Sequence, residues 1–355
     1  MRTKTTIKEI ARAAGVSPAT VSIVLNGKDY RISEKTRAKV VRVANELDYR
    51  PKQLAVSLRS QRSRTLGLIL PDVSNAFFAE IAKGAEEQAF ASGYAVILCN
   101  TNDQASRDVL YINLLIDRHV DGIALTASCP LQGTERSACR KQLALSQTPA
   151  VLIDRTPLSD TTSSIMVDHQ KGGYLATEYL LEQGHRAVGC ITGPLRMYTA
   201  SLRYQGYCKA LEAYGVARDM RLVEYGHYHM EDGEQAAARL IRHGATAIFA
   251  CNDLMAYGVY RYAKAQGLSI PEDLSVVGFD DLYFSALPDP PLTTVGQNAW
   301  EIGAAAIRKL IALIENKSEK NESLRAEPRL VVRSSVAKPG GRQRSAQGDQ
   351  EDHTR

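Results

Sequence analysis

Polar side chains that suit ligand binding directly follow several apolar, strand-like runs of this 355-residue chain. An asparagine comes soon after "TLGLIL", an Asp-Arg pair follows "PAVLI", and single acids or amides follow "AIFAC", "SVVGF" and "PLTTVG". The carboxyl ends of parallel strands share one edge of a sheet, and ligands of open α/β folds bind at that edge. The residues concerned are Asn75, Asp154, Arg155, Asn252, Asp280 and Gln297.

The chemistry of this set suits a small, neutral, hydroxyl-rich ligand. Carboxylates and amides pair with vicinal hydroxyls, arginine offers a planar fork of donors, and aromatic rings pack on the C–H face of a sugar. Phe77, Phe78 and Tyr228 would supply such rings. Each residue also has a purely structural alternative, since Asp154 and Asp280 would cap the helices that follow and the phenylalanines would belong to a core.

Strands and helices alternate from Thr65 onward, and this alternation indicates the scaffold of the site. Apolar runs such as "AVILC", "GIALTA", "SIMVD", "AVGCIT" and "LSVVGFD" are separated by helix-like stretches. Continuous apolar strands between amphipathic helices are typical of parallel sheets that are covered on both faces. Two series of them, one after the other in residues 65–337, predict an α/β core of two doubly wound lobes with a cleft between them.

The first 50 residues differ from this core in both charge and pattern. Residues 1–64 contain 15 Lys/Arg and 5 Asp/Glu, a balance of +10, whereas the remaining 291 contain 29 and 34, a balance of −5. Apolar stripes predict three short helices in "TIKEIARAAGV", "VSPATVSIVLN" and "SEKTRAKVVRVANELDY". Two helices joined by a glycine turn and braced by a third form a helix-turn-helix. The basic charge favours a polyanion as partner, with a solvated basic face as the alternative.

The second of these helices has an outer face without a single charge. Ser17 is placed to cap this helix, Pro18 suits its first turn, and Asn26 with Gly27 would end it. The inner face, expected to pack on a small core, comprises Val21, Val24 and Leu25, and the outer face comprises Ala19, Thr20, Ser22 and Ile23. The third helix is predicted to begin after Ser33 and to bury Val40, Val43, Ala44 and Leu47.

Two further segments are interpreted as a connector and a tail. Residues 51–64, "PKQLAVSLRSQRSR", are basic and form too short a helix to be stable alone in water, so we expect this linker to order only when bound or paired. Residues 338–355 are polar and expected to be disordered.

The composition argues against several other classes of protein. No apolar run approaches the length of a membrane span and the first residues lack the apolar core of a signal peptide, so a cytoplasmic location without a membrane partner is expected. The six cysteines form no C-x-x-C pair and the seven histidines are scattered, with "HYH" at 227–229 alternating as on a strand. We therefore expect free thiols and no metal or other cofactor. No nucleophile elbow, P-loop or dinucleotide fingerprint indicates an enzyme.

Segments along most of the chain resemble, in order, the LacI/GalR family of transcriptional regulators. They include "TIKEIARAAGVSPATVSIVLNG", "ISEKTRAKVVRVANELDYRP", "LAVSLRS", "GHRAVGCITGP", "ACNDLMAYGV" and "PEDLSVVGFDD". The resemblance covers residues 5–337 and implies a homodimer whose second helix enters the major groove of double-stranded operator DNA. It also implies a hinge helix over residues 51–59 in the minor groove, where Leu58 matches the leucine wedge of the family. Ordinary packing between domains is the alternative for Leu58.

The DNA-contacting positions that the resemblance implies differ from the family in one respect. Pro18, Ala19 and Ile23 occupy base-reading positions, yet none of them can make a bidentate contact to a base. Ala19 and Ile23 would touch thymine methyls, so the hinge and DNA deformability are expected to supply much of the specificity. The full set is Thr6, Ser17, Pro18, Ala19, Thr20, Ser22, Ile23, Asn26, Arg31, Ala55, Leu58 and Arg59.

The core also resembles periplasmic ribose-binding proteins at the sugar-contacting positions. The match of "SLRYQGY" adds Arg203, for which a pair with an acid is the alternative, and Tyr228 stands where those proteins have phenylalanine. Met197 departs from the purine-binding branch, which has an arginine there. The resemblance implies that a small sugar, ribose or a related pentose, relieves operator binding.

Two questions stay open at this point. A purine, sugar-phosphate or protein co-repressor that strengthens DNA binding is the alternative to an inducing sugar. Residues 338–355 contain no leucine, which favours a dimer over the tetramers that a C-terminal leucine heptad would form.

Overall fold

The chain divides into two compact units, residues 1–63 and 64–355, and the division lies within the segment 51–64. The first unit contains helices α1 (Ile7–Ala14), α2 (Pro18–Leu25) and α3 (Glu34–Glu46) around a core of its own. The computed structural model describes residues 5–25, 32–49, 62–128, 134–155, 162–316 and 318–340.

Local hydrogen bonds explain where the helices of the first unit begin and end. The hydroxyl of Ser17 accepts from the backbone N–H of Thr20 at 3.1 Å, and that of Ser33 accepts from the N–H of Thr36 at 3.3 Å. Both caps were predicted from the sequence, because a serine at this position satisfies an N–H that has no partner within the helix. Gly15 ends α1 with φ 64, a left-handed conformation that glycine adopts at little cost.

The core of the first unit follows the predicted stripes with one error. Leu25 is only partly buried against this core. Leu47, predicted to belong to the stripe of the third helix, is 38% exposed, because α3 ends at Glu46 and Leu47 caps its C-terminus. The buried side chains come from all three helices and are Ile10, Ala11, Ala14, Val21, Val24, Val40, Val43 and Ala44.

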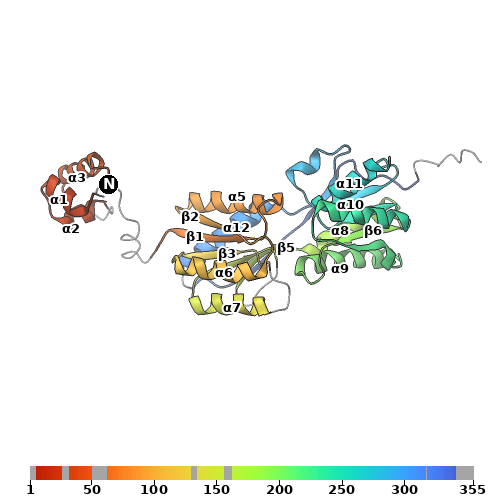
Figure 1. Ribbon diagram of the computed structural model, residues 1–355, viewed down its shortest axis with the longest axis horizontal. Helices are drawn as coiled ribbons and strands as arrows, with labels where there is room; N and C mark the ends of the chain where they lie inside the picture. The colour runs from red at the N-terminus through yellow and green to blue at the C-terminus, as the bar shows by residue number, and fades with distance from the viewer. Residues whose placement is uncertain are drawn as a thin grey trace, which may run out of the picture. The chain divides into compact units, whose positions relative to one another are not determined.

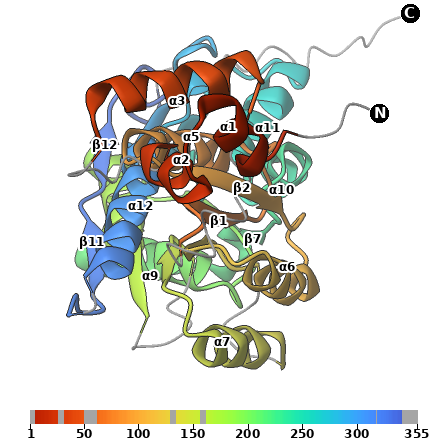
Figure 2. The same ribbon diagram turned by 90° about the vertical axis from the view of Figure 1, so that its left-hand side faces the viewer.

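The second unit is a two-lobed α/β structure, as predicted (Figure 1). The first lobe contains a six-stranded sheet in the order β11-β5-β4-β3-β1-β2, and all neighbouring strands are parallel. Its strands are β1 (Thr65–Leu70), β2 (Ala95–Asn100), β3 (Gly122–Leu125), β4 (Ala150–Ile153), β5 (Ser163–Val167) and β11 (Ser323–Ala326). Helices α5 (Ala76–Ala91) and α12 (Ala299–Glu315) pack together on one face, and α6 (Ala105–Asp117) and α7 (Thr134–Ser146) on the other (Figures 1 and 2).

The second lobe repeats this arrangement with a sheet in the order β12-β10-β9-β8-β6-β7. Its strands are β6 (Val188–Thr192), β7 (Val223–Tyr225), β8 (Ala247–Ala250), β9 (Ser275–Asp280), β10 (Thr293–Gly296) and β12 (Arg329–Val331). The covering helices form two pairs, α8 (His169–Glu182) with α9 (Tyr198–Ala213) and α10 (Met230–Arg242) with α11 (Asp253–Ala265). Two short 3₁₀ turns, η1 (Met220–Leu222) and η2 (Tyr283–Ala286), complete it.

The two lobes are not consecutive segments of the chain, which corrects the sequence prediction. After β10 the chain returns to the first lobe, where α12 packs on α5 and β11 pairs with β5, and it then crosses back to form β12. The chain therefore passes between the lobes three times, after β5, β10 and β11. Strand periodicity cannot reveal such a return, because α12 carries an ordinary apolar stripe that would fit either lobe.

The second sheet also departs from the predicted all-parallel arrangement. Strand β12 pairs antiparallel with β10 at the edge of the sheet. Its three residues are exposed or only partly buried, so they lack the continuous apolar run by which the other strands were recognised. The strands that the apolar runs predicted are all present, and the short edge strands β7, β11 and β12 are additions.

Three further observations concern the described residues only. None of their helices combines the length and the hydropathy needed to cross a membrane. Their histidines, cysteines and acids nowhere form a group of three or more suited to hold a metal ion. Cys99, Cys139, Cys190 and Cys251 are buried free thiols, and Cys208 is a partly buried one.

Candidate functional site

A cavity of about 120 Å³ lies between the two lobes, at the carboxyl ends of their strands. This volume is several times the ~10–15 Å³ that a single water needs, so a small molecule fits there. The lining residues are Asp72, Ser74, Asn75, Phe77, Phe78, Asp103, Asp154, Arg155, Thr199, Arg203, His227, Tyr228, His229, Asn252, Leu254 and Asp280. The cavity therefore has the position that the sequence predicted for a ligand site.

The start of α5 contributes an amide and two aromatic rings from the first lobe. The side-chain oxygen of Asn75 accepts from the N–H of Phe77 at 3.0 Å and so caps the helix. Phe77 and Phe78 are buried, with their rings edge-to-face at 5.2 Å between centroids. The structural interpretation of these residues is therefore realised, and ligand binding by them stays a prediction that the geometry permits, since capping uses only the oxygen of Asn75 and both rings also line the cavity.

An acid and an arginine follow β4 and point in different directions. Asp154 is 4% exposed, and its Oδ1 lies 2.9 Å from Nε2 of His169. Burial alone would raise the pKa of Asp154, but the proximity of His169, Arg203 and Arg155 more than offsets this and holds it below its ordinary value. The ionised carboxylate is thus the favoured form, and it contacts a histidine rather than capping a helix.

Arg155 forms an ion pair that the sequence did not predict. Its guanidinium donates to the carboxylate of Asp103, with one of the two bonds at 3.3 Å, and lies 5.3 Å from the ring centroid of Phe78. Burial opposes the charge of Arg155, yet the carboxylate of Asp103 keeps the pKa of the guanidinium above its ordinary value. Asp103 itself has φ 55 and is half exposed at the cavity.

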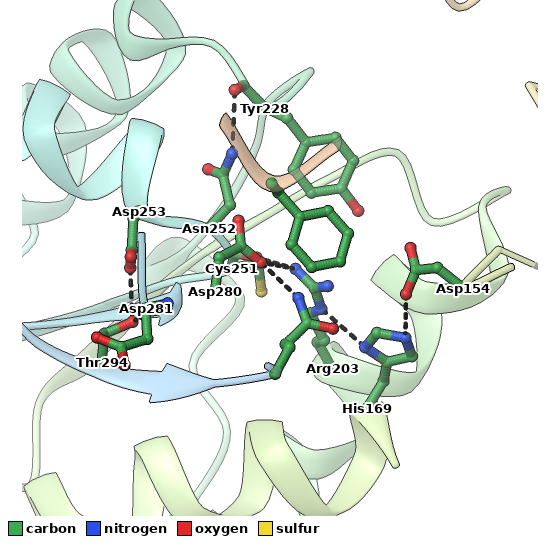
Figure 3. Close-up of polar contacts among 12 residues, drawn as sticks. Asp154, His169, Arg203, Tyr228, Cys251, Asn252, Asp253, Asp280, Asp281 and Thr294 are labelled. Atoms are coloured by element: carbon green, nitrogen blue, oxygen red, sulfur yellow. Dashed lines mark hydrogen bonds and ion pairs between the residues drawn. The ribbon is translucent and has the colours of Figure 1, made fainter. Parts of the chain in front are cut away.

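The second lobe places a buried network around Arg203 (Figure 3). Its Nε donates to Nδ1 of His169 at 3.2 Å, an Nη donates to the carbonyl of Cys251, and the guanidinium lies 3.8 Å from the ring centroid of Phe279. Oδ1 of Asp280 is 3.7 Å away, so the predicted alternative of a pair with an acid is also realised.

Asp280 is the least stabilised charge of this network. Gln297 donates to its Oδ1 at 2.6 Å. Burial raises the pKa of Asp280 well above its ordinary value, Arg203 and Gln297 oppose this rise, and Asp253 and Asp154 add to it. Protonation of Asp280 is therefore far easier than protonation of Asp154. The side-chain oxygen of Gln297 is buried without a hydrogen-bond partner among the described residues.

The segment that contains Tyr228 corrects another sequence prediction. Residues 227–229 were interpreted as strand-like, but Tyr228 has φ 70 and His229 is the N-cap of α10, so the segment is a loop. The ring of Tyr228 turns inward over Gly193, where an added Cβ would lie 2.2 Å from a ring carbon. Burial, against the opposing charges of Arg203 and Arg155, raises the pKa of Tyr228 to about 12. Asn252 donates to the carbonyl of Tyr228 at 3.1 Å and fixes this loop.

Nine of the ten predicted ligand residues line the cavity, and Gln297 reaches it only through Asp280. Backbone strain also occurs at the cavity, where Asp154, Tyr228 and Asp280 have φ of 58, 70 and 125. The sequence analysis missed the remaining lining residues and His169. For Asp103 and His169 the same signal was available, since both follow an apolar strand at its carboxyl end.

The outer face of α2 forms a second candidate surface, on the first unit. Pro18 and Ala19 are exposed, Thr20 and Ser22 are partly buried, and Ile23 is 37% exposed. Ser17 is exposed while it caps the helix. The predicted DNA-contacting residues Asn26, Arg31, Ala55, Leu58 and Arg59, and the predicted hinge helix, lie outside the described residues.

Thr6, the N-cap residue of α1, is the remaining predicted DNA-contacting residue that the structure describes. Its backbone N–H and hydroxyl both donate to the carboxylate of Glu9, at 2.6 and 3.0 Å. This capping box holds the exposed threonine in place at the beginning of the helix.

Two family profiles match this chain and together span most of it. Residues 6–52 match the "Bacterial regulatory proteins, lacI family", and residues 63–333 match the "Periplasmic binding proteins and sugar binding domain of LacI family".

Curated relatives and a Lac repressor structure align over nearly the whole chain. The ribose operon repressor of Haemophilus influenzae is 36% identical over 333 residues, which are 93% of this chain and 98% of the relative. The transcriptional repressor PurR of Pasteurella multocida is 34% identical over 333 residues, with the same two coverages of 93% and 98%. A Lac repressor dimer bound to operator and an anti-inducer is 28% identical, with a TM-score of 0.84 over 94% of this chain and 100% of that one.

Proposed function

This chain belongs to the LacI family of bacterial transcriptional regulators, and from that premise we propose that its cleft binds a small uncharged sugar, ribose or a related pentose. Regulators of this family bind operator DNA and sugar effectors and act as dimers. The observation that carries the proposal is the set of buried, oppositely charged and aromatic side chains that line one small cavity between the lobes.

The charges of the cavity favour a neutral ligand over a phosphorylated one. Two guanidinium groups line it, and both are already engaged, Arg155 by Asp103 and Arg203 by His169 and a carbonyl. The carboxyls that line it are Asp72, Asp103, Asp154 and Asp280. Even with Asp280 protonated, carboxylates outnumber guanidinium groups, so the phosphate of a sugar phosphate would meet net repulsion.

The polar groups that remain suit hydroxyls. Ionised Asp154 accepts hydrogen bonds from hydroxyls. Asp280, which is protonated more easily, can also donate one hydrogen bond in its protonated form. Asn75 and Asn252 add side-chain amides. The rings of Phe78 and Tyr228 flank the cavity and would pack on the C–H faces of a pyranose or furanose. The name of the Haemophilus influenzae relative, a ribose operon repressor, is consistent with a pentose.

On the DNA side we propose the major-groove role for α2. Its uncharged outer face allows close approach, with Ala19 and Ile23 against base edges and the hydroxyls of Thr20 and Ser22 at phosphates. The predicted hinge residues Ala55, Leu58 and Arg59 would contact the minor groove. A homodimer bound to a two-fold operator follows from this arrangement, and the Lac repressor dimer bound to operator supports it.

The two versions of this function differ in whether the ligand weakens or strengthens operator binding. In the proposed version the sugar weakens operator binding through a coupling free energy of about 1–3 kcal/mol. A purine co-repressor that strengthens binding is the second version, suggested by the relative named PurR. Met197, the N-cap residue of α9, does not line the cavity, but it stands where the purine-binding branch that this chain resembles has an arginine, and this departure disfavours that version.

Calorimetric titration of the full chain with ribose, ribose 5-phosphate and hypoxanthine tests the ligand. We expect binding of ribose alone, and tighter binding of either other compound would overturn the proposal. Fluorescence anisotropy with operator DNA, selected in vitro from random duplexes, then tests the sign. Ribose should weaken the complex, and a strengthened complex would make the sugar a co-repressor.

A further inference from the structure

His169 connects the two lobes at the ligand cavity, although it does not line the cavity itself. It is the first residue of α8, directly after the chain passes from the first lobe to the second, and it is fully buried. Its Nε2 lies 2.9 Å from Oδ1 of Asp154, which follows β4 of the first lobe. Its Nδ1 lies 3.2 Å from Nε of Arg203, on α9 of the second lobe (Figure 3).

The two contacts determine which nitrogen of the ring carries the proton. Nε of Arg203 has a hydrogen and no lone pair to offer, so it can only donate, and Nδ1 of His169 must accept. A neutral ring then carries its proton on Nε2 and donates it to the carboxylate of Asp154. The hydrogen bonds run in one direction, from Arg203 to His169 to Asp154.

Burial and the adjacent guanidinium of Arg203 keep the ring in this neutral form. Burial lowers the pKa of His169, the nearby carboxylates of Asp154 and Asp168 oppose this, and Arg203 adds to the lowering. Asp280, 3.7 Å from Arg203, is the next titratable group. Protonation on Nδ1 would remove the acceptor of Arg203 and place two cations side by side.

The arrangement decides which atoms are left for a ligand. Oδ1 of Asp154 is occupied by the ring, and Nε of Arg203 is occupied as well, whereas Oδ2 of Asp154, a residue that lines the cavity, has no hydrogen-bond partner among the described residues. Both the ring and the guanidinium pack on Phe279, with centroid distances of 6.0 and 3.8 Å. A change of tautomer would break both hydrogen bonds at once.

We propose that His169 is a positioning residue, held as the Nε2–H tautomer, that ties Asp154 of the first lobe to Arg203 of the second and thereby sets the geometry in which both meet the sugar. The proposal rests on the proposed sugar-binding function for its effect on affinity. Its statement about the tautomer stands on the structure alone.

The tautomer is tested first, on the full chain labelled with ¹⁵N in its histidine rings. Long-range ¹H–¹⁵N spectra at pH 7.5 should show a pyrrole-type Nε2 and a pyridine-type Nδ1 for the His169 ring, assigned by its loss in His169→Gln. A pyrrole-type Nδ1 would overturn the proposal, whether or not any sugar binds.

Affinity is tested by calorimetry with ribose. His169→Phe retains a flat ring and removes both hydrogen bonds, so ribose affinity should fall roughly tenfold or more. His169→Gln can still donate to Asp154 and should lose less. His185→Phe is the matched control, because His185 is also buried and bonds Thr246 and the carbonyl of Ala337, away from the cavity. Its ribose affinity should stay as in the wild type.

A pH profile separates positioning from a general loss of stability. Wild-type affinity should be constant while the ring is neutral and fall as the ring protonates, at a pH below the ordinary histidine pKa, whereas His169→Phe should lack this acid limb. Wild-type ribose affinity retained by a folded His169→Phe, or an unchanged acid limb in it, would overturn the proposal. If no sugar binds the wild type, the proposed function fails, and the tautomer measurement still decides the assignment of His169.

Discussion

The two candidate recognition surfaces of this regulator differ in how their side chains are held before any partner arrives. The outer face of α2 consists of small, uncharged, largely exposed residues, of which Ile23 is the largest. The cleft instead buries carboxylates and guanidinium groups that already contact one another, as Arg203 does with Asp280.

This difference has a physical cause. A buried charge is costly unless it is paired and hydrogen-bonded, so the protein itself must complete the cleft network and thereby fix its geometry. An exposed methyl or hydroxyl carries no such cost, and a DNA duplex can set its final position. Ligand binding in the cleft should therefore be sensitive to the loss of single internal contacts. DNA binding by α2 should depend mainly on the charge and size of its exposed side chains.

The largest expected effect is the loss of Arg203. Arg203→Ala removes the group that contacts His169, the carbonyl of Cys251 and Asp280, and leaves buried acceptors unpaired, so ribose affinity should fall ~100-fold or more. Calorimetry on the full chain measures it. Arg242→Ala, an exposed arginine of the same lobe, is the control and should leave affinity unchanged. A drop of less than threefold would show that the cleft is not preorganised by this network.

The next largest effect is expected at the exposed face of α2. Ile23→Asp puts a negative charge on the exposed face of α2, where it would repel phosphates, so operator affinity should fall ~10- to 100-fold while the first unit stays folded. Anisotropy with labelled operator measures the affinity. Ala38→Asp adds the same charge on the exposed face of α3 and should have a clearly smaller effect. Equal losses in the two variants would mean that α2 has no special role.

A smaller effect is expected for the ion pair at the cavity. Asp103→Asn leaves the guanidinium of Arg155 without its carboxylate, so the preference for ribose over ribose 5-phosphate should shrink about 5- to 10-fold. Competition titrations give the ratio. Asp117→Asn changes the same charge at an exposed position of α6 and should preserve the preference. An unchanged ratio in Asp103→Asn would show that the charge of the cleft does not select the ligand.

A final difference is a pH dependence of stability, which the cleft side has and α2 lacks. Asp253 is fully buried, and burial, opposed by hydrogen bonds from Ser285, Thr294 and the N–H of Leu282, raises its pKa to about 6. A raised pKa means that the native state binds the proton more tightly than the unfolded state, whose aspartate pKa is ~3.9. This group therefore adds stability as pH falls from about 6 toward 4.

Urea unfolding of the wild type and Asp253→Asn at several pH values isolates that contribution. The free energy of unfolding of the wild type relative to the variant should rise by ~2–3 kcal/mol between pH 7 and 4. A difference between the two proteins that stays constant with pH would show that Asp253 does not titrate in this range.

The sequence predicted most of the ligand-contacting candidates that line the cavity correctly as cavity-lining residues. Asn75, Asp154, Arg155, Asn252 and Asp280 follow apolar strands, and the geometry of a parallel sheet brings such positions to one edge wherever they occur in the chain. Which partners they would choose was not predictable, because Arg155 pairs with Asp103 and Asp154 with His169 across 52 and 15 positions of sequence. Those choices depend on side-chain directions that periodicity does not contain.

Local features of the chain were settled by its sequence: the caps at Ser17 and Ser33, most of the buried stripes of the three N-terminal helices and the apolar segments that form strands. Each of these depends on neighbours a few residues apart, through backbone hydrogen bonds and the periodic burial of apolar side chains. The tertiary structure alone decided that α12 and β11 return to the first lobe, that residues 227–229 form a loop, and that His169 joins the lobes. These features depend on contacts between distant segments, whose free energies no local pattern of residues reports.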